Sequence, residues 1–145
     1  MYDIKALYEA ENVQDAIRLL TEHPQAQIIA GGSDVLVQIR EGKRAGVELV
    51  SIYGLDELRG VSLEEDETLR IGSLTSFSHI TKNELIQKYI PVLGEAVDMV
   101  GGPQIRNIGT IGGNTCNGVT SADSASTLFA LEPPSATIFS RYQSC

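Results

Sequence analysis

The spacing of apolar residues alternates along the chain between helical and strand-like patterns, and the first clear segment is a helix. Between residues 13 and 20 apolar side chains recur at i, i+3, i+4 and i+7, the spacing of one helix face: Val13, Ala16, Ile17 and Leu20. Asn12 is a suitable N-cap for this helix, and Pro24 ends it. The pattern therefore predicts an amphipathic helix near the start of the chain.

Two short apolar runs follow, at residues 27–30 and 47–52, and both are typical of buried strands. Between them, Ser33 and Asp34 favour the start of a second helix, whose apolar face would consist of Val35, Leu36 and Ile39. With strand or coil before the first helix, residues 1–54 have the order β–α–β–α–β. We predict a first subdomain over residues 1–54, a small parallel layer with crossover helices.

The pattern changes after Gly54, where a second subdomain is predicted over residues 55–131. Residues 58–63 and 68–74 are expected to pair as strands around the acidic turn 64–67. Alternating apolar and polar residues in the second of these runs are typical of a half-buried strand. The hairpin is therefore the first element predicted for this subdomain.

Two helices are predicted after the hairpin. The segment Thr81–Glu84 has the pattern of a capping box and predicts the start of a short helix. Pro91 suits the first turn of the next helix, whose apolar face would consist of Leu93, Ala96, Val97 and Val100. Strands and helices in this order predict an α+β subdomain.

Composition and charge exclude several classes of protein. The chain has 145 residues, enough for one domain or two small subdomains, and 42% hydrophobic residues are incompatible with general disorder. A net charge of −8 is unsuited to binding a nucleic-acid backbone. No apolar run approaches the ~18 residues of a membrane span, and the first residues lack the apolar core of a secretory leader. We expect a cytoplasmic protein that binds neither nucleic acid nor membrane.

Metal-binding and catalytic side chains are not grouped in the sequence. Cys116 and Cys145 form no CxxC pair, and His23 and His79 are far apart, so no metal site is expected. Cys116 could line a site within its glycine-rich segment, but we expect it to fill a small buried space, and we expect Cys145 to be exposed. Since no Ser/His/Asp, Cys/His or paired-carboxylate arrangement is recognisable, no catalytic residue is predicted. Chemistry would then come from a bound cofactor.

Two glycine pairs are the strongest candidates for binding such a cofactor. They lie in AGGSD (residues 30–34) and TIGGN (residues 110–114), each after an apolar stretch. Such turns expose consecutive backbone N–H groups that can bind an anion, and a helix starting at Ser33–Asp34 would add its positive dipole end. A diphosphate would suit two such turns placed together. Either pair alone could equally be a tight turn, and neither a GxGxxG nor a P-loop motif is present.

The segments around both glycine pairs also carry a resemblance to a known family. The segments IIAGGSDVLVQ (residues 28–38), LRIGSLTSF (residues 69–77, taken as a strand) and GPQIRNIGTIGGNTCNGVTSADS (residues 102–124) resemble the FAD-binding subunits of molybdenum hydroxylases such as bacterial xanthine dehydrogenase. The likeness extends from about Tyr2 to Leu131 in the family's order and spacing. It implies an α+β, two-subdomain FAD-binding fold of the vanillyl-alcohol oxidase type.

The resemblance also implies which residues bind FAD, because the family holds the FAD diphosphate on backbone amides of the two glycine turns. The first segment is Ile28, Ile29, Ala30, Gly31, Gly32, Ser33, Asp34 and Val35. The second is Thr110, Gly113 and Asn114, with Ile111 and Gly112 shaping the turn. Asp123 matches an acid that the family uses near the sugar hydroxyls of FAD.

Purely structural roles remain open for the same residues. Ile28, Ile29 and Val35 would belong to a core with or without FAD, and Ser33, Asp34 and Asp123 could cap helices. Asn114 could be a left-handed turn residue, and Arg106 could bind a backbone carbonyl or a partner carboxylate. The residue types alone do not decide between these roles.

The resemblance further implies that the chain is one subunit of a flavoprotein oxidoreductase of purine catabolism. Electrons would leave the substrate at a molybdenum cofactor on a large subunit and cross two 2Fe-2S clusters on a small subunit. They would reach FAD on this chain and pass to NAD. The implied partners are therefore the molybdenum-binding and iron–sulfur subunits.

The likeness ends near Leu131, although family subunits continue considerably further. Residues 132–145 (EPPSATIFSRYQSC) form a tail unlike the family, and Pro133–Pro134 would interrupt a strand. We interpret the chain as a truncated or frameshifted product with the C-terminal part of the fold missing. An unfinished sheet would give weak or no FAD binding by the chain alone and a tendency to aggregate. The alternative function is a cofactor-free fragment or assembly module of the same fold.

Overall fold

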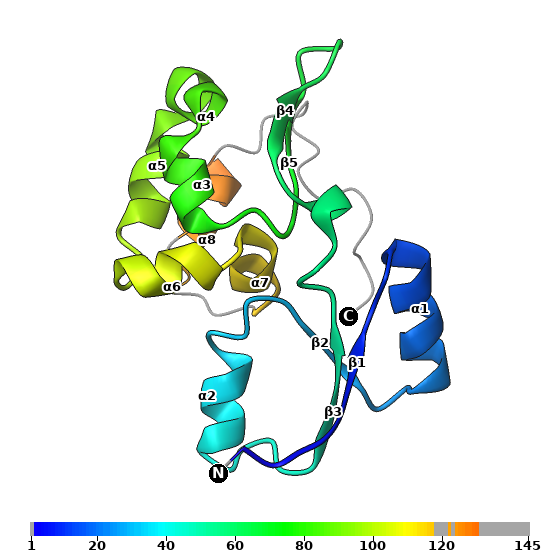
Figure 1. Cartoon of the computed structure of the whole chain (residues 1–145). Helices are drawn as coiled ribbons and strands as arrows, with labels where there is room; N and C mark the ends of the chain where they lie inside the picture. Colours follow the sequence, from blue (N-terminus) through cyan, green and yellow to red (C-terminus); the bar gives the residue numbers. More distant parts are fainter. Residues whose placement is uncertain (1, 118–121, 123, 131–145) are drawn as a thin grey trace. The chain divides into compact units, whose positions relative to one another are not determined.

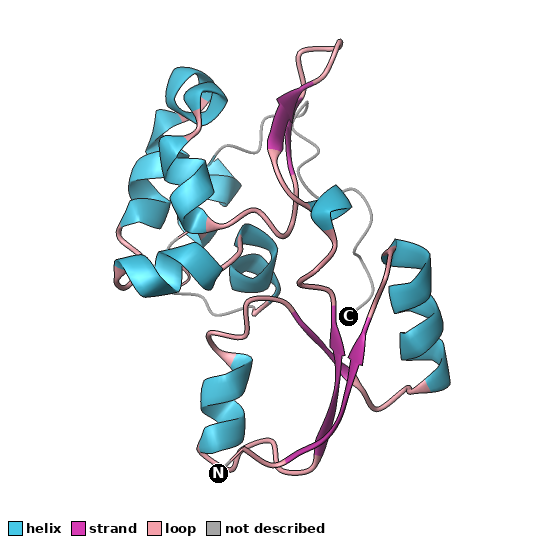
Figure 2. Cartoon of the chain, in the orientation of Figure 1, coloured by secondary structure: helices cyan, strands magenta, loops and turns pink. Residues whose placement is uncertain are grey.

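The structure is a computed structural model that describes residues 2–117, 122 and 124–130. The chain divides into two compact units, Met1–Leu58 and Arg59–Cys145. The boundary expected at Gly54 lies shortly before this division. Helices and strands are mixed, as Figure 2 shows, in agreement with the α+β class. No helix among the described residues is both long and apolar enough to cross a membrane.

A three-stranded parallel sheet with the order β1-β3-β2 forms the centre of the first unit. The elements follow the predicted order: β1 (Ile4–Glu9), α1 (Val13–Glu22), β2 (Gln27–Ile29), α2 (Val35–Arg40) and β3 (Val47–Ser51). Because β3 lies between the other strands, the two right-handed crossovers run in opposite directions across the sheet. Helices α1 and α2 therefore lie on opposite faces of it (Figure 1).

Local sequence signals explain how these helices begin. The Asn12 side chain accepts a hydrogen bond from the Asp15 amide at 2.8 Å, which confirms the predicted cap of α1. The buried face of α1 is centred on Ala16 and Leu19, whereas Ile17 is exposed, so the predicted face was partly wrong. Helix α2 contributes Ile39 to a core that it shares with the strands; the other buried members are Ile29 and Leu49.

An antiparallel hairpin opens the second unit. Its strands, β4 (Val61–Leu63) and β5 (Leu69–Ile71), pair around the acidic turn as predicted, but both are shorter than expected. A 3-10 helix, η1 (Asp56–Leu58), occupies the start of the predicted first strand. The interpretation of residues 69–77 as one strand was also wrong, because Phe77 begins a helix.

Six helices follow the hairpin in the described part of the second unit. They are α3 (Phe77–Lys82), α4 (Glu84–Tyr89), α5 (Pro91–Asp98), α6 (Pro103–Ile108), α7 (Ile111–Cys116) and α8 (Ala125–Ala130). The cap predicted at Thr81 lies instead at Asn83, whose side chain accepts hydrogen bonds from the first amides of α4. Thr81 is inside α3 and donates to the Phe77 carbonyl at 3.0 Å. Helices α6 and α7 occupy the segment that was expected to form glycine-rich turns.

One hydrophobic core joins the hairpin to these helices. Its buried members come from α3, α4, α5 and α7: Phe77, Ile80, Ile86, Leu93, Val97 and Ile111. The inward side chains of both hairpin strands and Leu128 of α8 pack against them. Ile111 thus anchors the second glycine pair to the core of its unit.

Candidate functional site

The first glycine pair lies in the turn between β2 and α2. Gly32 has φ +73°, a conformation that glycine adopts without a steric penalty. The amides of residues 31–35 donate no hydrogen bond to any described part of the chain. Asp34 occupies the cap position of α2 without capping it, because its carboxylate accepts from the Gln38 side chain. The turn therefore presents consecutive unused donors, a backbone arrangement suited to an anion.

The apolar residues of this segment have different surroundings. Ile29 is buried against Ile39 and Leu49, and Val35 packs against the same core. Ile28 is 47% exposed and is the residue of this set that has apolar surface left for a ligand. Ile29 and Val35 therefore have the role in the hydrophobic core that the sequence left open for them.

The second glycine pair forms the first turn of α7 rather than an open turn. Thr110 is the N-cap, and its hydroxyl accepts from the Gly113 amide at 3.1 Å. The Ile111 amide donates to the Thr75 carbonyl at 3.1 Å, and the Gly112 amide donates to the Ser73 carbonyl at 2.8 Å. The expectation that this pair exposes consecutive backbone donors was wrong, because the Gly112 amide is bonded to the loop before α3 and the Gly113 amide to the Thr110 hydroxyl.

The two glycines of this pair face different surroundings. A Cβ at Gly112 would lie 2.7 Å from the Ser73 carbonyl oxygen, closer than real Cβ contacts, so only glycine fits there. Gly113 is exposed, and its nearest neighbour is the Thr110 hydroxyl of its own cap, 3.0 Å from an added Cβ. Gly112 therefore serves the packing of α7, while Gly113 leaves open surface for a ligand.

The other residues singled out by the sequence lie near α6 and α7. Arg106 donates to the Gly101 carbonyl at 2.9 Å and lies 3.4 Å from an Asp98 carboxylate oxygen, so it holds the connection between α5 and α6. Cys116 is exposed at the end of α7, contrary to the expected buried position. Asp123 lies outside the described residues.

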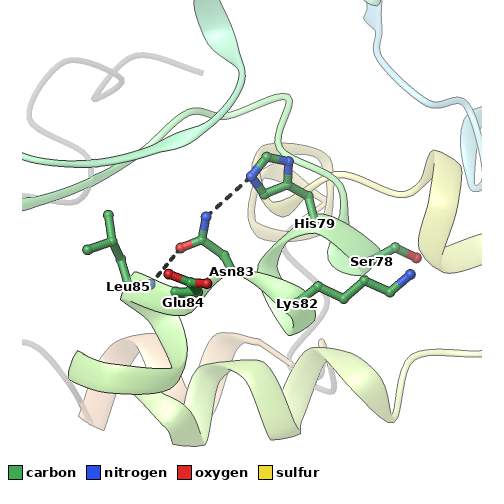
Figure 3. Close-up of a pocket in the computed structure, with 6 residues that line it drawn as sticks. All are labelled: Ser78, His79, Lys82, Asn83, Glu84 and Leu85. Carbon is green, nitrogen blue, oxygen red and sulfur yellow. Dashed lines mark hydrogen bonds between the residues drawn. The ribbon is translucent and has the colours of Figure 1, made fainter.

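A surface hollow of about 520 Å³ lies along α3 and α4 (Figure 3). The Asn83 side-chain nitrogen lies 3.5 Å from His79 Nε2, and its oxygen accepts from the Leu85 amide at 3.0 Å. The hollow is lined by Ser78, His79, Lys82, Asn83, Glu84 and Leu85. None of these residues was predicted to bind a cofactor. Among the described residues no group of His, Cys, Asp and Glu is suited to holding a metal ion.

The family of the chain follows from residues 2–137, which match the FAD binding domain in molybdopterin dehydrogenase. The chain belongs to this family of FAD-binding domains. The resemblance carried by the glycine segments is thereby confirmed.

Named relatives agree with this assignment. The chain is 46% identical over 125 residues to a xanthine dehydrogenase FAD-binding subunit of Escherichia coli O157:H7, covering 86% of this chain and 43% of the relative. It is 32% identical to a nicotinate dehydrogenase FAD-subunit of Eubacterium barkeri, with 86% and 43% covered. The chain thus spans less than half the length of these curated relatives.

Solved structures confirm the fold. A carbon monoxide dehydrogenase chain from Hydrogenophaga pseudoflava superposes with a TM-score of 0.77 at 30% identity, covering 81% of this chain and 41% of that one. A quinoline 2-oxidoreductase chain from Pseudomonas putida 86 gives a TM-score of 0.70 at 26% identity, covering 75% and 38%. The chain therefore has the FAD-binding fold of this family.

The residues of this FAD-binding domain fit the cofactor at the first glycine segment. Its unused amides of residues 31–35 suit a diphosphate, and the exposed Ile28 offers apolar surface. At the second segment the amides of residues 111–113 are already bonded, so a cofactor would contact Gly113 and the side chain of Asn114. The convergence of both segments on one diphosphate stays a prediction, because they belong to different units.

Sequence reasoning missed the residues that support α7. Ser73 and Thr75 act through their backbone carbonyls, which no side-chain pattern reveals. Ser124, which donates to the Asn114 side chain, was noticed only as part of the SADS segment. The small polar residues of the LTSF and SADS segments were the available signal, since buried small hydroxyl side chains usually bind neighbouring polar groups.

Proposed function

We propose that this chain forms the diphosphate-binding part of an FAD site in a xanthine dehydrogenase-like molybdenum hydroxylase. The observation that carries the proposal is the run of unused amides at residues 31–35, within a domain of an FAD-binding family. Backbone donors would hold the negative diphosphate in a chain whose net charge is −8. The names of the relatives, a xanthine and a nicotinate dehydrogenase FAD subunit, support the reaction class.

The residues of this chain would bind and orient the cofactor rather than act as acid or base. The backbone amides of residues 31–35 would donate to the diphosphate. In the second glycine segment, Gly113 and Asn114 would contact the same diphosphate. When bound, FAD supplies two-electron redox chemistry between iron–sulfur clusters of a small partner subunit and NAD. The molybdenum cofactor would belong to a large partner subunit, in a cytoplasmic complex.

A flavin titration tests this function. FAD, which contains a diphosphate, should bind with a lower dissociation constant than FMN, which has a single phosphate, when both are titrated and followed by the change in flavin absorbance. Gly31→Val should abolish this preference, because a branched side chain would cover the amides. Gly54→Val is the matched control, since a Cβ at Gly54 meets nothing within 4 Å.

The alternative, a cofactor-free module of the same fold, makes the opposite prediction. Such a module would bind neither flavin at saturating concentration, and Gly31→Val would change nothing. Equal binding of FAD and FMN would contradict a diphosphate site while leaving a flavin site in place.

A further inference from the structure

The first turn of α7 has already used its backbone donors. Ser73, Thr75 and the Thr110 hydroxyl accept from the amides of residues 111–113, and the Asn114 amide donates to the Thr110 carbonyl at 3.0 Å. Thr110 itself is 4% exposed. With the amides of residues 111–114 bonded, the exposed or half-buried group of this turn that still has N–H donors to offer is the Asn114 side chain.

The orientation of the Asn114 side chain is set by a buried serine. The Ser124 hydroxyl donates to Asn114 Oδ1 at 2.5 Å, and Ser124 is fully buried, immediately before α8. A carboxamide carries its acceptor oxygen and its two N–H donors on opposite sides. With the oxygen held by Ser124, the two N–H groups of Asn114 must point the other way. Sequence separation makes this contact a tertiary one, joining α7 to α8.

We propose that Ser124 is a positioning residue that fixes Asn114 as a hydrogen-bond donor to the phosphate oxygens of the cofactor. An unrestrained carboxamide could turn its oxygen toward the anion, which would repel it, whereas the hydrogen bond from the Ser124 hydroxyl to Oδ1 stabilises the orientation with the N–H groups toward the anion. The inference rests on the proposed FAD site. It assigns the second glycine segment a side-chain donor where the sequence indicated main-chain donors.

Asn114→Asp tests the donor role of the side chain. The carboxylate keeps the size of the side chain and still accepts from Ser124, so the fold should persist. It replaces both N–H donors by a negative oxygen, and FAD affinity of the full chain should fall about tenfold or more. Asn107→Asp, at an exposed position of α6, adds the same charge elsewhere and is the matched control.

Ser124→Ala tests the positioning role, with Ser126→Ala as control because Ser126 is an exposed serine of α8. Ser124→Ala should weaken FAD binding about three- to tenfold, the size of a typical lost hydrogen bond. The same change made in Asn114→Ala should cost nothing further, because Ser124 then has no side chain to orient. An equal loss in both backgrounds would overturn the positioning role.

A spectroscopic measurement on the unaltered chain tests the inference even if Ser124→Ala lowers the stability of the fold. The side-chain N–H pair of Asn114 should shift in a ¹⁵N–¹H spectrum of the unaltered chain when FAD is added. An unshifted pair in a chain that binds FAD would overturn this inference and leave the proposed function standing. A chain that binds no FAD even at saturating concentration would match the cofactor-free alternative and contradict both proposals, and that result is recognised before any variant is made.

Discussion

The two glycine segments have nearly the same sequence pattern and use their backbones in opposite ways. In the first, the amides of residues 31–35 make no hydrogen bond with the described chain. In the second, the amides of residues 111–113 are all bonded to neighbouring acceptors. A pair of glycines therefore indicates close backbone approach, but the approaching group can be a ligand or the protein itself.

The difference has a physical cause in the residues that surround each pair. Thr110 caps its helix through its side chain, whereas the Asp34 carboxylate is turned away to Gln38. The loop at Ser73–Thr75 lies against the second pair and supplies two carbonyls. The amides of the first segment thus have no acceptor in the described chain, whereas those at the start of α7 are already hydrogen-bonded.

The largest effect is expected for Gly112→Ala. The new Cβ would lie 2.7 Å from the Ser73 carbonyl oxygen, a backbone atom that cannot move without shifting the loop. The free energy of unfolding should fall by about 3 kcal/mol, as for a severe overpacking substitution. Urea denaturation measures it, with Gly54→Ala as the uncrowded control. A change as small as the control's would remove the packing role of Gly112.

A smaller loss is expected for Thr75→Val in the loop that supports α7. The Thr75 hydroxyl is buried, accepts from the Gly60 amide at 2.9 Å and donates to the Gly60 carbonyl at 3.0 Å. Valine has the same shape but leaves the Gly60 amide without its partner, which should cost about 2 kcal/mol, whereas the Gly60 carbonyl still accepts from the Gly72 amide at 2.9 Å. Thr75→Ser should restore most of the stability in the same urea experiment; failure of this rescue would point to the methyl group instead.

Gly32→Ala examines the first segment. Gly32 has φ +73°, and alanine in this region is strained by about 1 kcal/mol. An added Cβ would also lie 3.1 Å from the flexible Leu36 side chain. Thermal unfolding should show this modest loss, well below that of Gly112→Ala. Equal losses of stability in Gly32→Ala and Gly112→Ala would contradict the view that the second glycine pair is packed more tightly than the first.

The smallest stability effect is expected for Asp34→Asn. Asp34 is exposed and does not cap α2, so the free energy of unfolding should change by less than about 0.5 kcal/mol. Removing a negative charge beside the unused amides should nevertheless tighten FAD binding about two- to threefold at low salt. The gain should disappear at high ionic strength; an affinity gain that persists there would not be electrostatic.

The sequence predicted the regular elements of the first unit well, because each is bounded by a strong local signal. Asn12, Pro24 and the apolar runs at residues 27–30 and 47–52 place its helices and strands without tertiary information. The hairpin and the helix after Pro91 were predicted for the same reason. Helix α3 was missed because it is short and follows directly on a run that alternates like a strand.

The candidate site was predicted as a set of residues but not as a set of contacts. Glycine content does not reveal that Ser73 and Thr75 accept from α7, because backbone carbonyls have no sequence signature. The burial of Ser124 against Asn114 likewise depends on the packing of α8. These are tertiary effects, and local patterns contain no information on them.

The strand order of the first unit also determines when that unit can form during synthesis. Strands β1 and β2 share no hydrogen bonds, since β3 lies between them. The sheet therefore cannot begin to assemble before the ribosome has released the first residues of β3, and it cannot be complete before Ser51 is released. Until then β1 has no partner strand, and the turn with the unused amides has no sheet to hold it in place.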